Sequence, residues 1–173
     1  MFLAQAHARL AGALDELDPI LGPLGERFAD AGYELALVGG SVRDAVLGRL
    51  GNDLDFTTSA RPDEVERLLR EFTRGVKGAA VWDIGKEFGT IGARRGDTIV
   101  EVTTHSADAY DGVTRKPVVA FGDNLDEDLV RRDFTVNAMA VRLHPDGRHE
   151  FVDPLNGMDA LLAGVLDTPA APE

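Results

Sequence analysis

The sequence predicts an α+β fold in which a small mixed sheet is flanked by helices. Three observations favour this class: apolar residues recur at helical spacing towards both ends of the chain, short strand candidates cluster in the middle, and no internal repeat is visible. With 173 residues, of which 44% are hydrophobic and 6% aromatic, the chain has enough apolar side chains for one globular domain.

The first two thirds of the chain contain most of the expected elements. Apolar residues recur every three or four positions in the opening segments, which predicts helices, whereas short apolar runs between glycine or charged turns predict strands. Gly39, Gly40 and Ser41 mark a sharp turn from a strand into a helix, and Pro62 with acids behind it favours the start of another helix. The expected order is helices at 3–17 and 21–31, a strand at 34–38, a helix at 41–47, a strand at 53–57, a helix from 61, and strands at 80–84, 89–94 and 98–103.

The last third of the chain returns to a helical pattern. One helix over 124–139 is expected from the apolar residues that stand between its charges, namely Leu125, Leu129, Phe134, Val136 and Met139. A strand at 140–143, a hairpin turn at Asp146-Gly147 and a strand at 150–152 follow, and a short helix at 158–162 comes last. The polar, proline-rich end from Asp167 is typical of a linker.

Composition excludes several classes of function. The chain has no cysteine, which removes disulfides, zinc–thiolate sites, iron–sulfur ligation and thiol nucleophiles. No run of about eighteen apolar residues is present, and charges interrupt the apolar positions at the N-terminus, so we expect a cytoplasmic protein that does not contact a membrane. The net charge of -12 lacks the basic footprint of a free-standing nucleic-acid binder, so any RNA is expected to be held mainly by something outside this chain.

Two carboxylates two positions apart carry the strongest chemical signal. Asp53 and Asp55 lie on one expected strand, so they point to one face while Leu54 and Phe56 turn into the core. Two like charges this close are unfavourable unless a cation neutralises them. Mg²⁺ suits a site in which a few carboxylates are completed by phosphate oxygens and water. We therefore expect Asp53 and Asp55 to bind Mg²⁺ and to catalyse displacement at phosphorus.

The glycine turn that precedes these carboxylates suits a phosphate group. Gly39 and Gly40 allow a phosphate to approach the backbone, and the helix that follows offers its free amides. Arg43 adds a charged fork to the same place. Phosphate and metal are therefore expected to meet near this turn.

A second polar cluster lies between Glu127 and Asn137. Arg132 suits a triphosphate, and Asp133 with Asn137, four positions apart on one helix face, suits a sugar or a base edge. Taken alone, a charge run on a helix is more often a solvated face, but the glycine turn and the paired carboxylates favour a nucleotide site.

Three other interpretations of the Asp53 segment stay open. A solvated turn with aspartates as helix caps leaves the spacing of the two glycines and Arg43 unexplained. The Asp-x-Asp-x-Thr spacing also occurs in phosphatases that form an aspartyl-phosphate on the first Asp, although there it follows a long apolar strand. A calcium loop would use Asp53, Asp55, Thr57, Ser59 and Glu64, yet its required glycine is replaced by Thr58.

Five motifs occur in the order and spacing of a known family: GGSVRDAVLG, NDLDFTT, EFGTIG, DLVRRDFTVNAMA and FVDPLNGMDALLAGVL. From about Leu35 to Pro169 the chain closely resembles the head of class II tRNA nucleotidyltransferases, that is, the CCA-adding enzymes and the related bacterial poly(A) polymerases. The resemblance implies a polymerase-beta-like fold that transfers a nucleoside monophosphate from CTP or ATP to the 3′ end of a tRNA and releases pyrophosphate. It implies that the metal is bound by Asp53 and Asp55, and the nucleotide by Gly40, Arg43 and Arg132.

The chain departs from the family in two places. Members usually continue into a helical neck that reads the incoming base and into helices that grip tRNA, whereas this sequence ends at Glu173. We therefore expect N-terminal helices at 1–32, a head at 33–166, and at 167–173 the start of a linker to an absent neck. Where the family commonly has Phe-Arg, this chain has His105-Ser106, and His105 is expected on the surface.

Several expectations remain alternatives. The chain is either an active CCA-adding head, a poly(A) polymerase head, or a fragment that binds nucleotide and Mg²⁺ but is inactive without its neck. Glu101 is a candidate third carboxylate or, equally, a paired or exposed strand acid. Trp82 is expected in the core or in a pocket wall. His7, His144 and His149 have no metal-ligand spacing, and an exposed docking surface predicts weak self-association.

Overall fold

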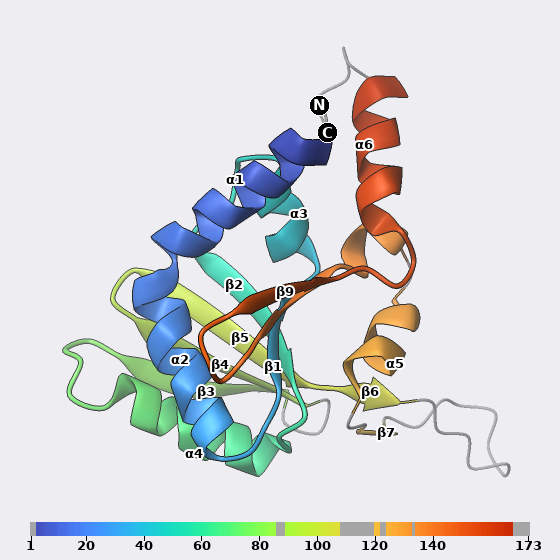
Figure 1. The fold of residues 1–173 in the computed structure, drawn as a ribbon. Coiled ribbons are helices and arrows are strands. Elements are labelled where there is room, and N and C mark those ends of the chain that lie inside the picture. The colour runs from blue at the N-terminus through green and yellow to red at the C-terminus, as the bar shows by residue number, and fades with distance from the viewer. Residues whose placement is uncertain (1–2, 86–88, 108–119, 122–123, 133, 168–173) are drawn as a thin grey trace, which may run out of the picture.

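A seven-stranded mixed sheet forms the centre of the molecule (Figure 1). Its strand order is β3-β4-β5-β2-β1-β8-β9, and every neighbouring pair is antiparallel except β2 and β5, which run parallel. The structure, a computed structural model, describes residues 3–85, 89–107, 120–121, 124–132 and 134–167. The predicted α+β class with a mixed sheet flanked by helices is confirmed.

The elements follow one another along the chain mostly as the sequence predicts. They are α1 (Leu3–Glu16), α2 (Asp18–Asp30), β1 (Leu35–Val38), α3 (Gly40–Val46), β2 (Asp53–Thr58), α4 (Pro62–Thr73), β3 (Ala80–Gly85), β4 (Thr90–Arg95), β5 (Thr98–Thr104), β6 (Ser106–Ala107), β7 (Ala120–Phe121), α5 (Leu125–Val130), the 3₁₀ helix η2 (Thr135–Asn137), β8 (Ala140–Leu143), β9 (His149–Val152) and α6 (Gly157–Asp167). Strands β6 and β7 pair with each other outside the main sheet. In the part of the chain that the structure describes, no helix combines the length and the hydrophobicity needed to cross a bilayer.

Helices α1 to α4 build the main hydrophobic core on one face of the sheet. Helix α4 shows why: its buried residues recur at helical spacing, and it packs across β3 and β4. Leu54 and Phe56 of β2 point into this core, each 1% exposed. The alternation of side chains along β2 therefore sends Asp53 and Asp55 to the other face, as predicted.

The opposite face of the sheet is only partly covered. A smaller core joins Ala36 and Val38 of β1 to Leu125 and Leu129 of α5. Further along the sheet, on β2, β5 and β4, residues of this face include Asp53, Asp55 and Glu101, which are exposed. The carboxylates thus lie where the covered part of this face ends.

The prediction of one continuous helix over 124–139 is wrong. Helix α5 begins at an Asn124 cap, whose side chain accepts a hydrogen bond from the Glu127 amide, but it ends at Val130. The backbone at Phe134 is extended, and η2 follows as a separate turn before β8. Although Phe134 continues the apolar spacing of Leu125 and Leu129, its side chain is 66% exposed and marks no buried helix face.

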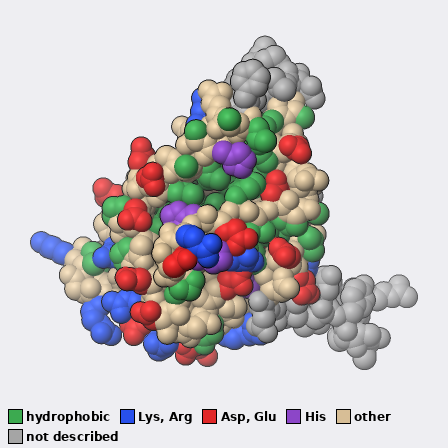
Figure 2. Space-filling view, in the orientation of Figure 1, with side chains coloured by type: hydrophobic (Ala, Val, Ile, Leu, Met, Phe, Trp, Pro, Cys, Tyr) green, Lys and Arg blue, Asp and Glu red, His purple; other side chains and the backbone are tan. Residues whose placement is uncertain are grey.

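Surface charge agrees with the absence of a basic footprint. Figure 2 shows acidic side chains spread over the face drawn and basic ones gathered towards its lower left, near the end of the molecule where α4 lies in Figure 1. On α4 the basic side chains pair with acids of the same helix, as in Arg67–Glu64 at 2.7 Å and Arg70–Glu66 at 2.8 Å. These pairs leave little net positive charge there to attract RNA.

Candidate functional site

Strand β2 holds Asp53 and Asp55 near the middle of the sheet. It pairs with β1 on one side and with β5 on the other, so the backbone that carries both carboxylates is fixed by two ladders. The Asp55 amide also donates to Ser41 Oγ at 2.9 Å, which ties the first turn of α3 to β2. The calcium-loop interpretation is wrong, because 53–58 is a strand and Glu64 lies on α4, which packs against the core face of the sheet.

Three carboxylates repel one another on this face. Glu101 of β5 lies in register with Asp55. Although the side chain is exposed to solvent, partial desolvation by its surroundings raises the pKa of Asp55; Arg132 partly offsets the rise and Asp53 adds to it. Burial likewise raises the pKa of Glu101, with further contributions from Asp55 and Asp53. A bound cation would relieve this repulsion.

The donor set fits a hard divalent cation that takes part of its coordination from a substrate. Asp53 and Asp55 supply oxygen ligands, which Mg²⁺ prefers. Among the described residues, no three His, Cys, Asp or Glu side chains lie close enough together to hold a metal ion by themselves. Such a site would need phosphate oxygens or water, which is the usual way Mg²⁺ is bound.

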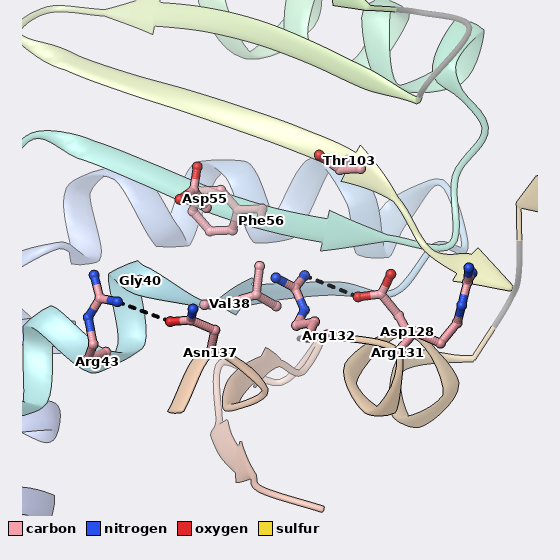
Figure 3. Close-up of a pocket in the computed structure, with 11 residues that line it drawn as sticks. Val38, Gly40, Arg43, Asp55, Phe56, Thr103, Asp128, Arg131, Arg132 and Asn137 are labelled. Atoms are coloured by element: carbon pink, nitrogen blue, oxygen red, sulfur yellow. Dashed lines mark hydrogen bonds and ion pairs between the residues drawn. The ribbon is translucent and has the colours of Figure 1, made fainter. Parts of the chain in front are cut away.

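A cavity of about 590 Å³ adjoins these carboxylates (Figure 3). Six of the predicted site residues lie at this cavity: Gly39, Gly40, Arg43, Asp55, Arg132 and Asn137. Asp53 lies on the same face of β2 without lining the cavity, and Asp133 lies outside the described residues. Sequence reasoning missed five further lining residues, Val38, Phe56, Thr103, Asp128 and Arg131.

The glycine turn allows arginine side chains to approach the backbone. Gly39 adopts φ 62° and ψ -131°, a conformation that strongly favours glycine. A Cβ atom at Gly39 would lie 3.3 Å from Arg132 Nη1, and one at Gly40 would lie 3.1 Å from Arg43 Nη2. Larger residues here would displace the two guanidinium groups from the cavity.

Two side-chain pairs set the positions of these guanidinium groups, as Figure 3 shows. Arg43 donates from Nη1 to Asn137 Oδ1 at 3.1 Å. Arg132 donates from Nη2 to Asp128 Oδ2 at 3.2 Å, and Asp128 is 6% exposed. Arg132 Nε is buried and finds no hydrogen-bond partner among the described residues. The cavity therefore presents two positioned cations to an anionic ligand.

The structure corrects the predicted surroundings of Asn137. The helical face expected to join it to Asp133 does not exist, because Asn137 belongs to η2 and not to a continuous helix. Instead it contacts Arg43, which is 94 positions earlier in the chain. Asn137 thus links the glycine-turn segment to the second polar cluster.

One further expectation fails. His105 is fully buried and not on the surface: its Nδ1 lies 2.8 Å from Thr57 Oγ1, and its amide donates to the Thr58 carbonyl at 2.7 Å. The reason is the parallel pairing of β2 and β5, which brings the end of β5 against β2. Of the two alternatives for Trp82, the core is not met, because Trp82 belongs to neither core cluster of the described residues and packs on Gly92.

The fold and the site together define a head domain that suits a nucleotide and a divalent cation, with paired aspartates on a central strand beside an arginine-lined cavity and a glycine turn. Residues 35–167 match the family model described as the poly(A) polymerase head domain, and the chain belongs to this family. The predicted family and the polymerase-beta-like fold are confirmed.

Curated relatives are CCA-adding enzymes that are much longer than this chain. The enzyme of Lactobacillus helveticus is 40% identical over 152 residues, which cover 87% of this chain and 35% of that protein. The enzyme of Geobacillus kaustophilus is 40% identical over 141 residues, which cover 81% of this chain and 32% of that protein. The chain therefore spans about a third of the length of these relatives.

Solved structures of the same kind share the fold. The Bacillus stearothermophilus CCA-adding enzyme in complex with CTP superposes with a TM-score of 0.63 at 34% identity, covering 84% of this chain and 31% of that one. A tRNA nucleotidyltransferase complexed with a primer tRNA and an incoming ATP analog gives a TM-score of 0.60 at 32% identity, covering 80% of this chain and 36% of that one.

Proposed function

We propose that this chain is the catalytic head of a template-independent RNA nucleotidyltransferase, which transfers a nucleoside monophosphate from CTP or ATP to a tRNA 3′ end and releases pyrophosphate. One observation carries the proposal: Asp53 and Asp55 share a face of β2 beside the cavity that Arg43 and Arg132 line. The CTP complex of one relative and the primer tRNA complex of another support this choice of substrates.

The triphosphate is assigned to the arginine side of the cavity. Arg43 and Arg132 neutralise its charge, while Gly39 and Gly40 let it approach the backbone. Asn137 holds the Arg43 guanidinium in place and adds a polar group for the nucleotide. Asp133 stays a predicted nucleotide contact.

The carboxylates are assigned to Mg²⁺. Asp53 and Asp55 would hold it, and Glu101, in register with Asp55, is proposed as a third carboxylate that adds negative charge to the same face without itself binding the ion. When bound, Mg²⁺ supplies positive charge that favours ionisation of the RNA 3′ hydroxyl and stabilises the leaving pyrophosphate. The fixed strand that carries both aspartates keeps the reacting groups in line.

The tRNA and the base of the incoming nucleotide are assigned mainly to regions outside this chain. The net charge of -12 and the paired arginines of α4 leave little basic surface for tRNA. The proposed organisation is a head at 33–166, with α1 and α2 packed into its core and a linker beginning near 167. Weak self-association remains a prediction that sedimentation of the chain at high concentration tests.

The first experiment is calorimetric titration of the chain with ATP and with CTP, each with and without Mg²⁺. We expect Mg²⁺-dependent binding of both nucleotides with little preference between them. Asp53→Ala and Asp55→Ala should lose the Mg²⁺ dependence, whereas Asp97→Ala, which removes an exposed aspartate from the β4–β5 turn, should not. Failure of the chain to bind either nucleotide would contradict the proposed site.

A second experiment separates transfer from mere binding. Radiolabelled CTP or ATP is incubated with Mg²⁺ and a tRNA that lacks its terminal CCA, and incorporation into the RNA is measured. Incorporation that both aspartate variants abolish supports the enzyme. Binding without incorporation would instead identify a nucleotide-binding module that does not transfer the nucleotide by itself.

A further inference from the structure

The face that carries the carboxylates continues across β5, β4 and β3. The strand registers place Asp55 opposite Glu101, Glu101 opposite Gly92, and Gly92 opposite Trp82. Residues paired in neighbouring strands point to the same face of a sheet. One row therefore runs from the carboxylates to Trp82 on the edge strand β3.

Trp82 lies on the sheet with the face of its ring. A Cβ atom at Gly92 would come within 2.6 Å of both Cε2 and Nε1 and 3.0 Å of Cζ2. Since Cε2 lies between the other two atoms in the ring and is as near as either, Gly92 meets the face of the indole and not its edge. The other face of the indole points away from the sheet.

The hydrophobic core does not account for this tryptophan. Its neighbour Val81 packs against the main core, on the side of the sheet where α4 lies. Trp82 belongs to neither core cluster and is only partly buried. A flat aromatic surface on the face of an edge strand that carries the carboxylates is a typical stacking platform for a base of single-stranded nucleic acid.

Arg94 adds a positive charge to the same surface. The row next to that of Trp82 places Asp53 opposite Ile99, Ile99 opposite Arg94, and Arg94 opposite Ala80. Arg94 is exposed, and within the described ranges it forms no ion pair. Its neighbour Arg95 points to the other face and lies 4.6 Å from the Phe72 ring centroid.

The position of this surface matches the geometry of the proposed reaction. The nucleotide cavity lies mainly on the β1 side of β2, among residues of α3, α5 and η2, and on the β5 side only Thr103 is among its described lining residues. In an in-line displacement the attacking 3′ hydroxyl and the leaving pyrophosphate are on opposite sides of the phosphorus. With the triphosphate on the β1 side, the surface over β5, β4 and β3 is the side of the carboxylates from which the RNA end would approach. Neighbouring strands are about 4.8 Å apart, so the Trp82 indole, which lies over Gly92 of β4, is roughly 10 Å from β2. This distance is within reach of the last nucleotide.

We propose that Trp82 and Arg94 form a subsite for the 3′-terminal nucleotide of the RNA primer. The indole stacks on the terminal base, and the guanidinium contacts the phosphate that precedes it. This inference rests on the proposed function and adds residues that position the primer. Neither residue lines the nucleotide cavity, so the two sites can be tested separately.

Trp82 is the one tryptophan of the chain, so its fluorescence reports on the subsite directly. Tricytidylate RNA with a free 3′ hydroxyl is added to the chain, in the absence of nucleotide, until the RNA reaches millimolar concentration. Stacking should quench the fluorescence in a saturable way, whereas ATP with Mg²⁺ alone should leave it nearly unchanged. A fluorescence that does not respond to the RNA would overturn the proposal.

Variants supply the second measurement, in which incorporation of labelled nucleotide is followed at increasing primer concentration. Trp82→Ala should raise KM for the primer by about tenfold or more, since one base–aromatic stack is lost, and Trp82→Phe should restore much of it. Arg94→Ala should also raise this KM, whereas Arg95→Ala on the opposite face should not. The KM for ATP should stay the same in all four variants, and their circular dichroism should confirm folding.

The outcomes distinguish this inference from the proposed function. Calorimetric binding of ATP and Mg²⁺ together with an unresponsive Trp82 and an unchanged primer KM would refute the subsite and leave the nucleotide site standing. Absence of ATP binding would refute the nucleotide site, while the RNA titration, which needs no nucleotide, would still decide the subsite.

Discussion

Gly157 begins α6 at a point where the helix touches the backbone of η2. A Cβ atom there would overlap the Thr135 carbonyl oxygen and lie 2.9 Å from Met139 Cγ. Asp153 holds the turn in place, because its Oδ1 accepts from the Gly157 amide at 2.6 Å and its Oδ2 from the Met158 amide at 3.0 Å. Gly157→Ala should therefore force α6 and η2 apart.

The size of the effect follows from what the new methyl group meets. Overpacking costs about 1–3 kcal/mol, and the upper end applies because the main obstacle is backbone and not a flexible side chain. Replacing glycine by alanine in a helix stabilises the folded state by at most about 1 kcal/mol, which offsets part of this cost. The net loss is about 2 kcal/mol, which corresponds to a fall in Tm of about 4–8 °C for a chain of this size.

Thermal unfolding followed by circular dichroism measures this loss, and α6 offers a matched control. Gly164 lies in the same helix, and a Cβ atom there would have no neighbour within 4 Å. Gly164→Ala should therefore leave Tm unchanged or raise it. Since η2 carries Asn137, Gly157→Ala should also weaken ATP binding. A Gly157→Ala variant that melts at or above the wild-type temperature would refute the argument.

Two further predictions concern the site. Asn137→Ala removes the acceptor of Arg43 Nη1, so calorimetric affinity for ATP should fall about two- to tenfold with the Mg²⁺ requirement unchanged; equal affinity would contradict this role. Burial, with Asp53, holds the pKa of Asp55 above its ordinary 3.8, so without metal the folded state binds more protons than the unfolded state. The free energy of unfolding of the wild-type chain, measured relative to that of the Asp55→Asn variant, should therefore fall as the pH rises from about 3.8 through the raised pKa. Urea unfolding over a pH series measures both free energies, and a difference between them that does not change with pH would refute the prediction.

The local parts of the site could be predicted from the sequence. The two-residue period of a strand is enough to put Asp53 and Asp55 on one face and Leu54 in the core. The Gly39-Gly40 pair predicts a turn, and Gly39 indeed has a positive φ. Each of these inferences depends only on residues close together in the chain.

The parts that depend on long-range pairing could not be predicted in this way. Glu101 was a candidate whose position beside Asp55 follows from the parallel pairing of β2 and β5, which no spacing reveals. The same pairing buries His105, which as a polar residue next to a departure from the family pattern was expected on the surface. Apolar spacing also misled at Phe134, because spacing alone does not show which apolar side chains are buried.

The strand order shows how one sheet could serve the two substrates that we propose. Strand β2 lies between β1, which borders the arginine-lined cavity, and β5, which leads to Gly92 and Trp82. Its two carboxylates therefore stand between the two surfaces, so a triphosphate and an RNA end bound on opposite sides would meet at the metal ligands. A chain with β2 at the edge of the sheet could offer only one of these surfaces. The long-range β2–β5 pairing is thus as necessary to the proposed chemistry as the aspartates themselves.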